Sequence, residues 1–197
     1  MLLTKKTYKK REELKVKKLL PYCLIALLAI SLVACKGNGG GSSSNSSTTT
    51  PTTNTPLQGS WRAEENDLDF GGGVTADIAI TYAFAGNVVT DTYVITTNIP
   101  AAASPTGVAV TTTESFAAVG TFRLDGNNLY TTFKTASYSD GTQTLTDISA
   151  IESAMGGSGS LPVQVDNAEH LFGTYAVNGN ILTLTPTGQS AANFTKQ

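Results

Sequence analysis

Apolar and polar residues alternate along most of the chain after its first third. Ile78, Ile80, Tyr82 and Phe84 are each separated by one small or polar residue, and the run 89–97 alternates in the same way. Successive side chains of a β-strand point to opposite faces of a sheet, so a period of two indicates strands that are buried on one face. The pattern therefore predicts antiparallel strands with an apolar inner face.

Pairs of such runs are separated by short turns that contain glycine next to asparagine or aspartate. These residues tolerate the positive φ angles that tight hairpin turns require. We predict three hairpins: 78–97 around Gly86-Asn87, 116–133 around Asp125-Gly126-Asn127-Asn128, and 172–185 around Asn178-Gly179-Asn180.

The second and third hairpins resemble copies of one unit. The segments 120–129 and 173–182 both begin with Gly-Thr and an aromatic residue, and both reach a Gly-Asn turn near their end. Repeated hairpins are typical of a meander whose last strand pairs with its first. The sequence therefore predicts a mainly β domain, an antiparallel up-and-down meander that closes into a barrel.

One short helix is predicted between the repeated hairpins, over 147–155. Ser149 and Glu152 have the spacing of a capping box, and Gly156-Gly157 stops the helix. The flanking segment 156–162 is predicted to be a loop, as is 100–106.

The N-terminal region has a different pattern. Eight Lys or Arg residues within 1–18 precede an apolar run, 19–33, which is the order of a signal peptide. The run is shorter than the roughly 20 apolar residues that a transmembrane helix needs.

The end of this run, Leu32-Val33-Ala34-Cys35, resembles the lipobox of bacterial lipoproteins. The resemblance implies cleavage before Cys35 and attachment of diacylglycerol and acyl chains such as palmitate to that cysteine. Cys23 fits less well because Tyr22 precedes it, where the pattern has a small residue. The alternative is an uncleaved N-terminal anchor with an incidental cysteine.

The residues after Cys35 form a tether. Gly, Ser, Asn, Thr and Pro dominate 36–56, which lacks the apolar side chains needed for a core. The chain thus divides into a signal peptide (1–34), a lipidated cysteine with a disordered tether (35–56) and a β domain (57–197). Lys36 stands where inner-membrane lipoproteins carry Asp, so the resemblance implies anchoring at the outer membrane, on its periplasmic or surface face.

The charge of the domain argues against nucleic-acid binding, and its cysteine content rules out stabilisation by a disulfide. Residues 36–197 carry five Lys or Arg against thirteen Asp or Glu, a net charge of −8, although the whole chain has only −2. The few cations are scattered, whereas nucleic-acid binding requires a clustered basic face. Both cysteines precede residue 36, so no disulfide stabilises the domain, which must depend on hydrophobic burial.

The two ends of the domain resemble lipocalin-like bacterial lipoproteins. Leu57-Gln58-Gly59-Ser60-Trp61 has the L-x-G-x-W form of their opening strand, and 173–185 is similar to their closing hairpin. The resemblance implies an eight-stranded lipocalin-like barrel with Trp61 plugging one end. It also implies a basic residue across the face of Trp61, for which Lys196 is the candidate.

An aromatic set on the alternating faces is predicted to line the barrel interior. An eight-stranded barrel is wide enough either to hold one small molecule or to be filled by its own side chains. The sequence leaves both alternatives open, a ligand cavity and a packed core. The residues that we assign to cavity or core are Trp61, Tyr82, Phe84, Tyr93, Phe122 and Tyr175.

No catalytic, metal or cofactor site is predicted. His170, the only histidine, lies beside Glu169 without a nucleophile motif, and is interpreted as a loop-edge residue. The acidic residues of 64–69 precede three glycines, but the twelfth position of an EF-hand loop starting at Asp67 is Ile78 instead of Glu. A solvated acidic loop is preferred to an irregular calcium site.

Two functions remain. The first is a lipid-anchored binding module for a small apolar ligand or a protein partner in the cell envelope. The alternative is a structural or surface-interaction lipoprotein with a filled barrel and no ligand. The sequence predicts neither the ligand nor the oligomeric state.

Overall fold

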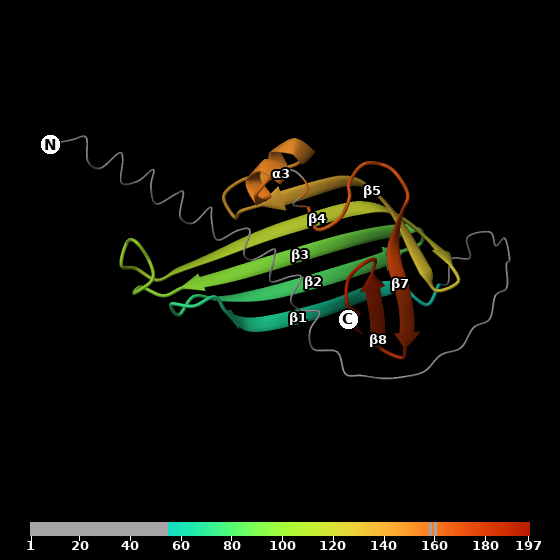
Figure 1. Cartoon of the computed structure of the whole chain (residues 1–197), viewed down its shortest axis with the longest axis horizontal. Helices are drawn as coiled ribbons and strands as arrows, with labels where there is room; N and C mark the ends of the chain where they lie inside the picture. The colour runs from blue at the N-terminus through green and yellow to red at the C-terminus, as the bar shows by residue number, and fades with distance from the viewer. Residues whose placement is uncertain (1–54, 158, 160) are drawn as a thin grey trace.

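The computed structural model describes residues 55–157, 159 and 161–197, which form a β-barrel with one short helix (Figure 1). The predicted signal peptide, the lipobox Leu32-Val33-Ala34, Cys35 and most of the tether lie outside these residues. The elements are β1 (Gly59–Asp69), β2 (Thr75–Ala85), β3 (Val88–Ile99), β4 (Val110–Asp125), β5 (Asn128–Ser139), β6 (Thr144–Leu145), α3 (Ile148–Met155), β7 (His170–Asn178), β8 (Ile181–Pro186) and β9 (Ala192–Lys196).

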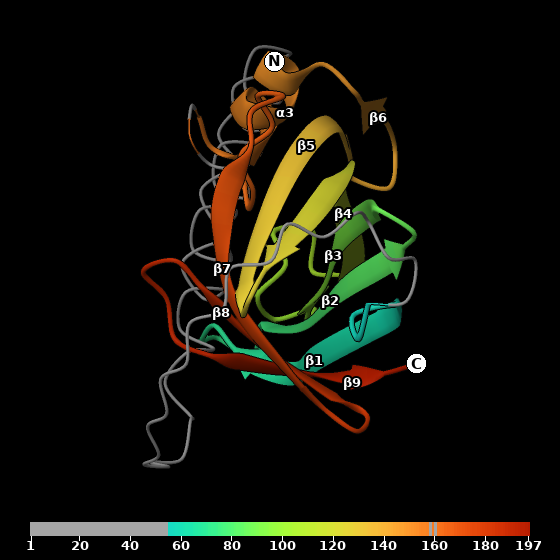
Figure 2. The same cartoon turned by 90° about the vertical axis from the view of Figure 1, so that its right-hand side faces the viewer.

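Eight of the strands close into a ring. Each of β1 to β5 pairs antiparallel with the next, β5 pairs with β7, and β7, β8 and β9 continue in order until β9 pairs with β1. The two-residue β6 lies outside the ring, on the edge of β5. Figure 2 shows the strands surrounding a common interior. The predicted closed antiparallel meander of eight strands with one short helix is confirmed.

The three predicted hairpins are β2–β3, β4–β5 and β7–β8. Their Gly-Asn turns form one end of the barrel, here called the closed end, where the Asn carbonyl of each turn accepts a backbone hydrogen bond from another strand. These bonds run from Phe122 N to Asn87 O (3.0 Å), from Tyr175 N to Asn127 O (2.9 Å) and from Lys196 N to Asn180 O (2.9 Å). The turn residues thus connect each hairpin to the next strand around the barrel.

The structure explains why each copy of the sequence repeat begins with glycine. Gly120 lies at a β-bulge in the β4–β5 pairing, and Gly173 lies at one between β5 and β7. A Cβ atom on Gly120 would be 2.1 Å from the Thr132 carbonyl oxygen, and one on Gly173 would be 2.1 Å from that of Thr185. Both repeats therefore require glycine because the neighbouring strand's backbone passes too close for a side chain.

The barrel wall is uneven in height. β1 to β4 are 11 to 16 residues long, whereas β7, β8 and β9 have 9, 6 and 5 residues. β5 pairs with β7 only from Asn128 to Thr131, and farther along β5 the Phe133 carbonyl accepts a hydrogen bond from Asn167 N at 3.2 Å. The long strands extend beyond the short ones (Figure 1), so one side of the barrel is open toward the loops.

The helix forms where it was predicted, but its cap differs. The Asp147 side chain accepts a hydrogen bond from Ala150 N at 2.9 Å and is the N-cap, and Ser149 Oγ donates to the same carboxylate at 2.6 Å. The predicted capping box is therefore wrong, since Ser149 already lies inside the helix. Gly156, with a φ of 119°, ends the helix as predicted.

Trp61 closes the interior near the turns. The ring is 0% exposed, and its Nε1–H donates to the Leu57 carbonyl oxygen at 2.7 Å. The Lys196 ammonium lies 5.1 Å from the ring centroid, within the range of a cation–π interaction. Phe84 and Leu129 also lie next to the turns and belong to the same cluster of buried core residues. Side chains therefore fill this half of the barrel.

No helix in the described part of the chain is long and apolar enough to cross a membrane.

Candidate ligand-binding cavity

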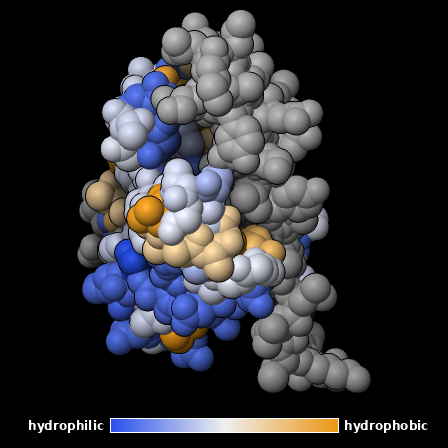
Figure 3. All heavy atoms as spheres, turned by 90° about the vertical axis from the view of Figure 1, so that its left-hand side faces the viewer, coloured by the Kyte–Doolittle hydropathy of each residue, from blue (hydrophilic) through white to orange (hydrophobic). Residues whose placement is uncertain are grey.

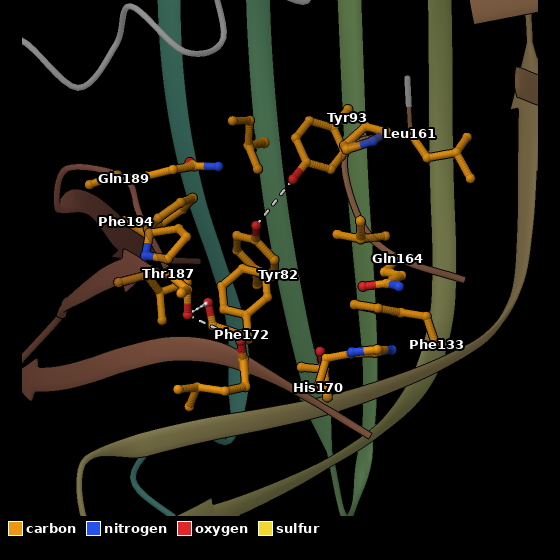
Figure 4. A pocket seen from close by; sticks show the side chains of 18 of the residues that line it. Tyr82, Tyr93, Phe133, Leu161, Gln164, His170, Phe172, Thr187, Gln189 and Phe194 are labelled. Atoms are coloured by element: carbon orange, nitrogen blue, oxygen red, sulfur yellow. Dashed lines mark hydrogen bonds between the residues drawn. The ribbon is translucent and has the colours of Figure 1, made fainter. Parts of the chain in front are cut away.

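A cavity of about 440 Å³ lies between the filled closed end and the loops of the open side (Figure 4). Its volume is within the range of small-molecule sites in proteins. Six strands and two loop segments line it. The strand residues include Ile80, Tyr82, Tyr93, Thr131, Phe133, Phe172, Leu184, Ala192 and Phe194, and the loop residues include 161–164, Thr187, Gln189 and Ser190.

Aromatic rings form one wall of the cavity. Tyr82 on β2 meets Phe172 on β7 and Phe194 on β9 edge to face, with ring centroids 5.7 Å and 5.2 Å apart. Edge-to-face contacts are the preferred geometry for aromatic pairs. The strands that position these rings are far apart in the sequence, so barrel closure brings this wall together.

Two tyrosine hydroxyls meet in the cavity. Tyr82 Oη and Tyr93 Oη are 3.2 Å apart and form a hydrogen bond across β2 and β3 (Figure 4). Behind them, toward the closed end, lies Asp91, two residues before Tyr93 on β3 and directly opposite Tyr82 in the strand pairing. Asp91 is 0% exposed.

The Asp91 carboxylate is the exceptional polar group of the interior. Neither of its oxygens has a well-formed hydrogen bond to any residue that the structure describes. Burial raises the pKa of this carboxyl well above its ordinary value, and the nearby hydroxyls of Tyr93 and Tyr82 offset only part of that effect. Burial and the Asp91 charge likewise raise the pKa of Tyr93 well above the usual range for tyrosine.

The rim of the cavity is polar. His170 Nε2 lies 2.9 Å from both carboxylate oxygens of Asp166, and Thr187 Oγ1 donates to the carbonyl oxygens of Leu171 (3.2 Å) and Phe172 (3.3 Å). The hydrogen bond from His170 contributes to lowering the pKa of Asp166, after the larger effect of the Ala168 amide. The cavity therefore has polar groups at its rim as well as the tyrosine hydroxyls in its interior.

The six predicted interior residues divide into two groups. Tyr82 and Tyr93 line the cavity. The other four do not: Trp61 and Phe84 are core residues, Phe122 packs on Phe84 with centroids 5.0 Å apart, and Tyr175 is partly buried against the core. Alternation identified which side chains point inward but contains no information about their height along the barrel.

Several lining residues were not in that set. Thr131 and Phe133 of β5 and the two loop segments became neighbours of Tyr82 only through the fold. A signal for Asp91 was present, because a carboxylate occupies an inward position between Val89 and Tyr93 in an otherwise apolar series.

The interpretation of the acidic residues 64–69 as a loop is wrong. They belong to β1, which has an irregularity in its pairing with β2 between Glu65 and Leu68. There the Asp67 amide donates to Asp77 Oδ1 at 2.9 Å. Among the described residues, no group of three or more His, Cys, Asp or Glu side chains is placed to hold a metal ion.

Apolar side chains are exposed at the opposite end from the Gly-Asn turns. Figure 3 views that end and shows orange and pale side chains around its middle. In the β3–β4 connection, Val108 is 63% exposed and Val110 at the start of β4 is 38% exposed. This surface lies apart from the cavity lining.

Comparison with known proteins gives no relative: no family model, curated protein or solved structure matches the chain.

Proposed function

We propose that this protein is a lipid-anchored binding module of the bacterial cell envelope that holds a small, largely apolar ligand inside its β-barrel. The observation that carries the proposal is the cavity of about 440 Å³, lined by aromatic and aliphatic side chains beside a filled closed end. Cavities of this kind, with few polar groups that fix orientation, are typical of small-molecule sites. No catalytic step is part of the proposal.

The anchor and location belong to the same proposal. The lipobox ending in Cys35 supports lipidation, and Lys36 supports transfer to the outer membrane. The resemblance to lipocalin-like lipoproteins supports binding as the role of the barrel. The tether would then hold the cavity away from the lipid headgroups.

Native mass spectrometry of the full chain, purified from the bacterium's envelope, tests this proposal. We expect an additional mass of small-molecule size that denaturation releases. Thr131→Phe, which places a ring in the cavity, should abolish that mass. The matched control is Thr132→Phe, because Thr132 is the next residue of β5 and points out of the barrel.

Two outcomes contradict the proposal. One is a chain that carries no additional mass and also fails to bind the neutral apolar dye N-phenyl-1-naphthylamine. The other is a ligand that both phenylalanine variants retain equally, which places it outside the barrel.

A second candidate function is surface interaction with an envelope protein. The exposed Val108 and Val110 favour it, since apolar side chains on a loop contribute to protein contacts. Val108→Ser together with Val110→Thr should abolish partner cross-linking on whole cells if this function is correct, and should leave dye binding unchanged.

A further inference from the structure

We propose that the ligand is an amphiphilic amine, whose ammonium group binds at the hydroxyls of Tyr82 and Tyr93 with Asp91 as its counter-charge. This inference rests on the proposed binding function and adds the chemical class of the ligand. It depends on the position of one buried carboxylate behind the cavity.

Asp91 lacks a cationic partner in the described chain. It is 0% exposed, and its neighbours across the strands are Tyr82 on β2 and Ala118 on β4. Burying a carboxylate without a partner is costly, and a bound cation removes much of that cost.

Three Lys or Arg side chains of the described residues already interact with other groups. Arg62 pairs with Glu64 and Arg123 with Glu169, both on the outside of the barrel, while the Lys196 ammonium lies over Trp61. Lys134, the remaining Lys or Arg among residues 55–157, 159 and 161–197, is exposed. A positive charge near Asp91 must therefore come from a bound molecule.

The tyrosine pair connects the cavity to this carboxylate. Both tyrosines line the cavity, and Asp91 lies opposite Tyr82 in the β2–β3 pairing and two residues from Tyr93 on the same face of β3. A hydroxyl can donate one hydrogen bond and accept others. The hydrogen bond between Tyr82 and Tyr93 uses only one of the two O–H groups, and both oxygens retain a lone pair that can accept a hydrogen bond from an ammonium group in the cavity.

The remaining lining fits the rest of such a molecule. Aromatic faces attract cations, and Tyr82 stands in a cluster with Phe172 and Phe194. Farther out, Leu161, Leu184 and other aliphatic side chains would contact an apolar body. An anionic head, by contrast, would lie beside the Asp91 carboxyl, and the described cations Arg62, Arg123 and Lys196 are engaged elsewhere.

Calorimetric titration of the full chain in lipid nanodiscs tests the inference, with empty nanodiscs as the blank. The ligands are n-hexylamine, n-hexanol and n-hexanoate, which share one alkyl chain and differ in the head group. We expect hexylamine to bind at least about tenfold more tightly than hexanol, which corresponds to about 1.4 kcal/mol. Hexanoate should bind most weakly.

Asp91→Asn keeps the shape of the side chain and removes its charge. It should abolish the preference for hexylamine while leaving the hexanol affinity within about twofold. The matched control is Glu114→Gln, because Glu114 is a partly buried carboxyl that, unlike Asp91, accepts a hydrogen bond, from Tyr138 at 3.0 Å. This control should retain the preference.

The outcomes separate the two proposals. If hexanol binds and hexylamine gains nothing, or if hexanoate binds best, the amine inference is overturned and the binding function stands. A preference that persists in Asp91→Asn also overturns the inference. If none of the three ligands binds and the apolar dye does not bind, the binding function itself fails. The wild-type comparison decides the inference even if Asp91→Asn does not fold.

Discussion

Asp91, Gly120 and Gly173 each have a structural role that depends on the identity of that single residue. Asp91 is fully buried, and no described residue gives its carboxylate a well-formed hydrogen bond. Gly120 and Gly173 lie where a neighbouring carbonyl oxygen would touch any side chain. At this scale, stability depends on a buried carboxyl and on two close backbone contacts.

The Asp91 carboxyl is expected to make stability depend on pH. Its pKa in the folded protein is raised above the unfolded value, so the native state binds the proton more tightly. Stability is then lost as the pH rises from about 4 toward the folded pKa, with a slope of at most about 1.4 kcal/mol per pH unit.

Denaturant unfolding of the wild type and Asp91→Asn at a series of pH values measures this effect. The free energy of unfolding of the variant, relative to the wild type, should increase from pH 4 to pH 8. Asp125→Asn, at an exposed turn, controls for the loss of one negative charge. A difference that stays constant over the range would show that Asp91 has the same affinity for protons in both states.

Gly120→Ala and Gly173→Ala are expected to destabilise the barrel. Each new Cβ would lie 2.1 Å from a carbonyl oxygen, so the strands must separate. We expect a loss of about 2–4 kcal/mol in the free energy of unfolding for each variant. Gly86→Ala is the control, since its Cβ meets no atom within 4 Å and only its φ of 62° is unfavourable. That control should cost about 1 kcal/mol, and an equal loss in all three would contradict the close-contact explanation.

The strands differ most in how extensively they are paired. β2 and β3 match residue for residue from Thr75–Asn98 to Ala85–Val88, whereas β1 and β9 share two pairs, Trp61–Lys196 and Arg62–Thr195. One further hydrogen bond, from Gln197 N to Ser60 O at 2.9 Å, extends that junction. The β1–β9 junction is therefore expected to open first.

Native-state hydrogen exchange of the Gln197 amide, which donates to Ser60 O on β1, tests this expectation. It should exchange faster than the amides of the β2–β3 pairing, because fewer neighbouring bonds must open with it. Uniform exchange across both pairings would contradict the weak junction.

Lys196→Gln removes the cation above Trp61 and should lower the free energy of unfolding by about 0.5–1 kcal/mol.

At the scale of the whole molecule, the uneven wall height determines where a ligand can enter. The long strands β1 to β4 form one tall side, and the short strands β7 to β9 leave the other side to loops (Figure 1). The closed end is filled around Trp61, so entry is expected from the side of His170 and the 187–190 loop. Under the proposed lipidation, Cys35 would hold this barrel at the membrane.

Cys35→Ser is expected to move the protein from the membrane fraction to the soluble fraction. The thiol that would receive the lipid is lost, while the barrel residues are unchanged. Immunoblotting of the two fractions measures the effect, and Cys23→Ser is the matched control within the apolar run. Membrane association that survives in Cys35→Ser would favour the uncleaved anchor instead.

The sequence by itself determined the three hairpins and the closed meander, but not the second half of β1. Hairpins are local: a period of two fixes the inward faces, and turns such as Gly86-Asn87 fix which runs pair. The 147–155 helix was also predictable from its breaker glycines, though its cap at Asp147 was not, because Asp, Ser and Thr at adjacent positions compete for that role.

The tertiary structure alone decided the cavity and its chemistry. Strand length, bulges and closure decide which inward residues lie at the same height along the barrel axis. These properties arise from contacts between distant segments. Tyr82 and Phe194 are neighbours because β9 closes on β1, and Trp61 lies below the cavity because β1 begins at the closed end. Burial of Asp91 behind the tyrosines is likewise a property of the closed barrel, since a lone polar residue in an alternating strand does not reveal what will surround it.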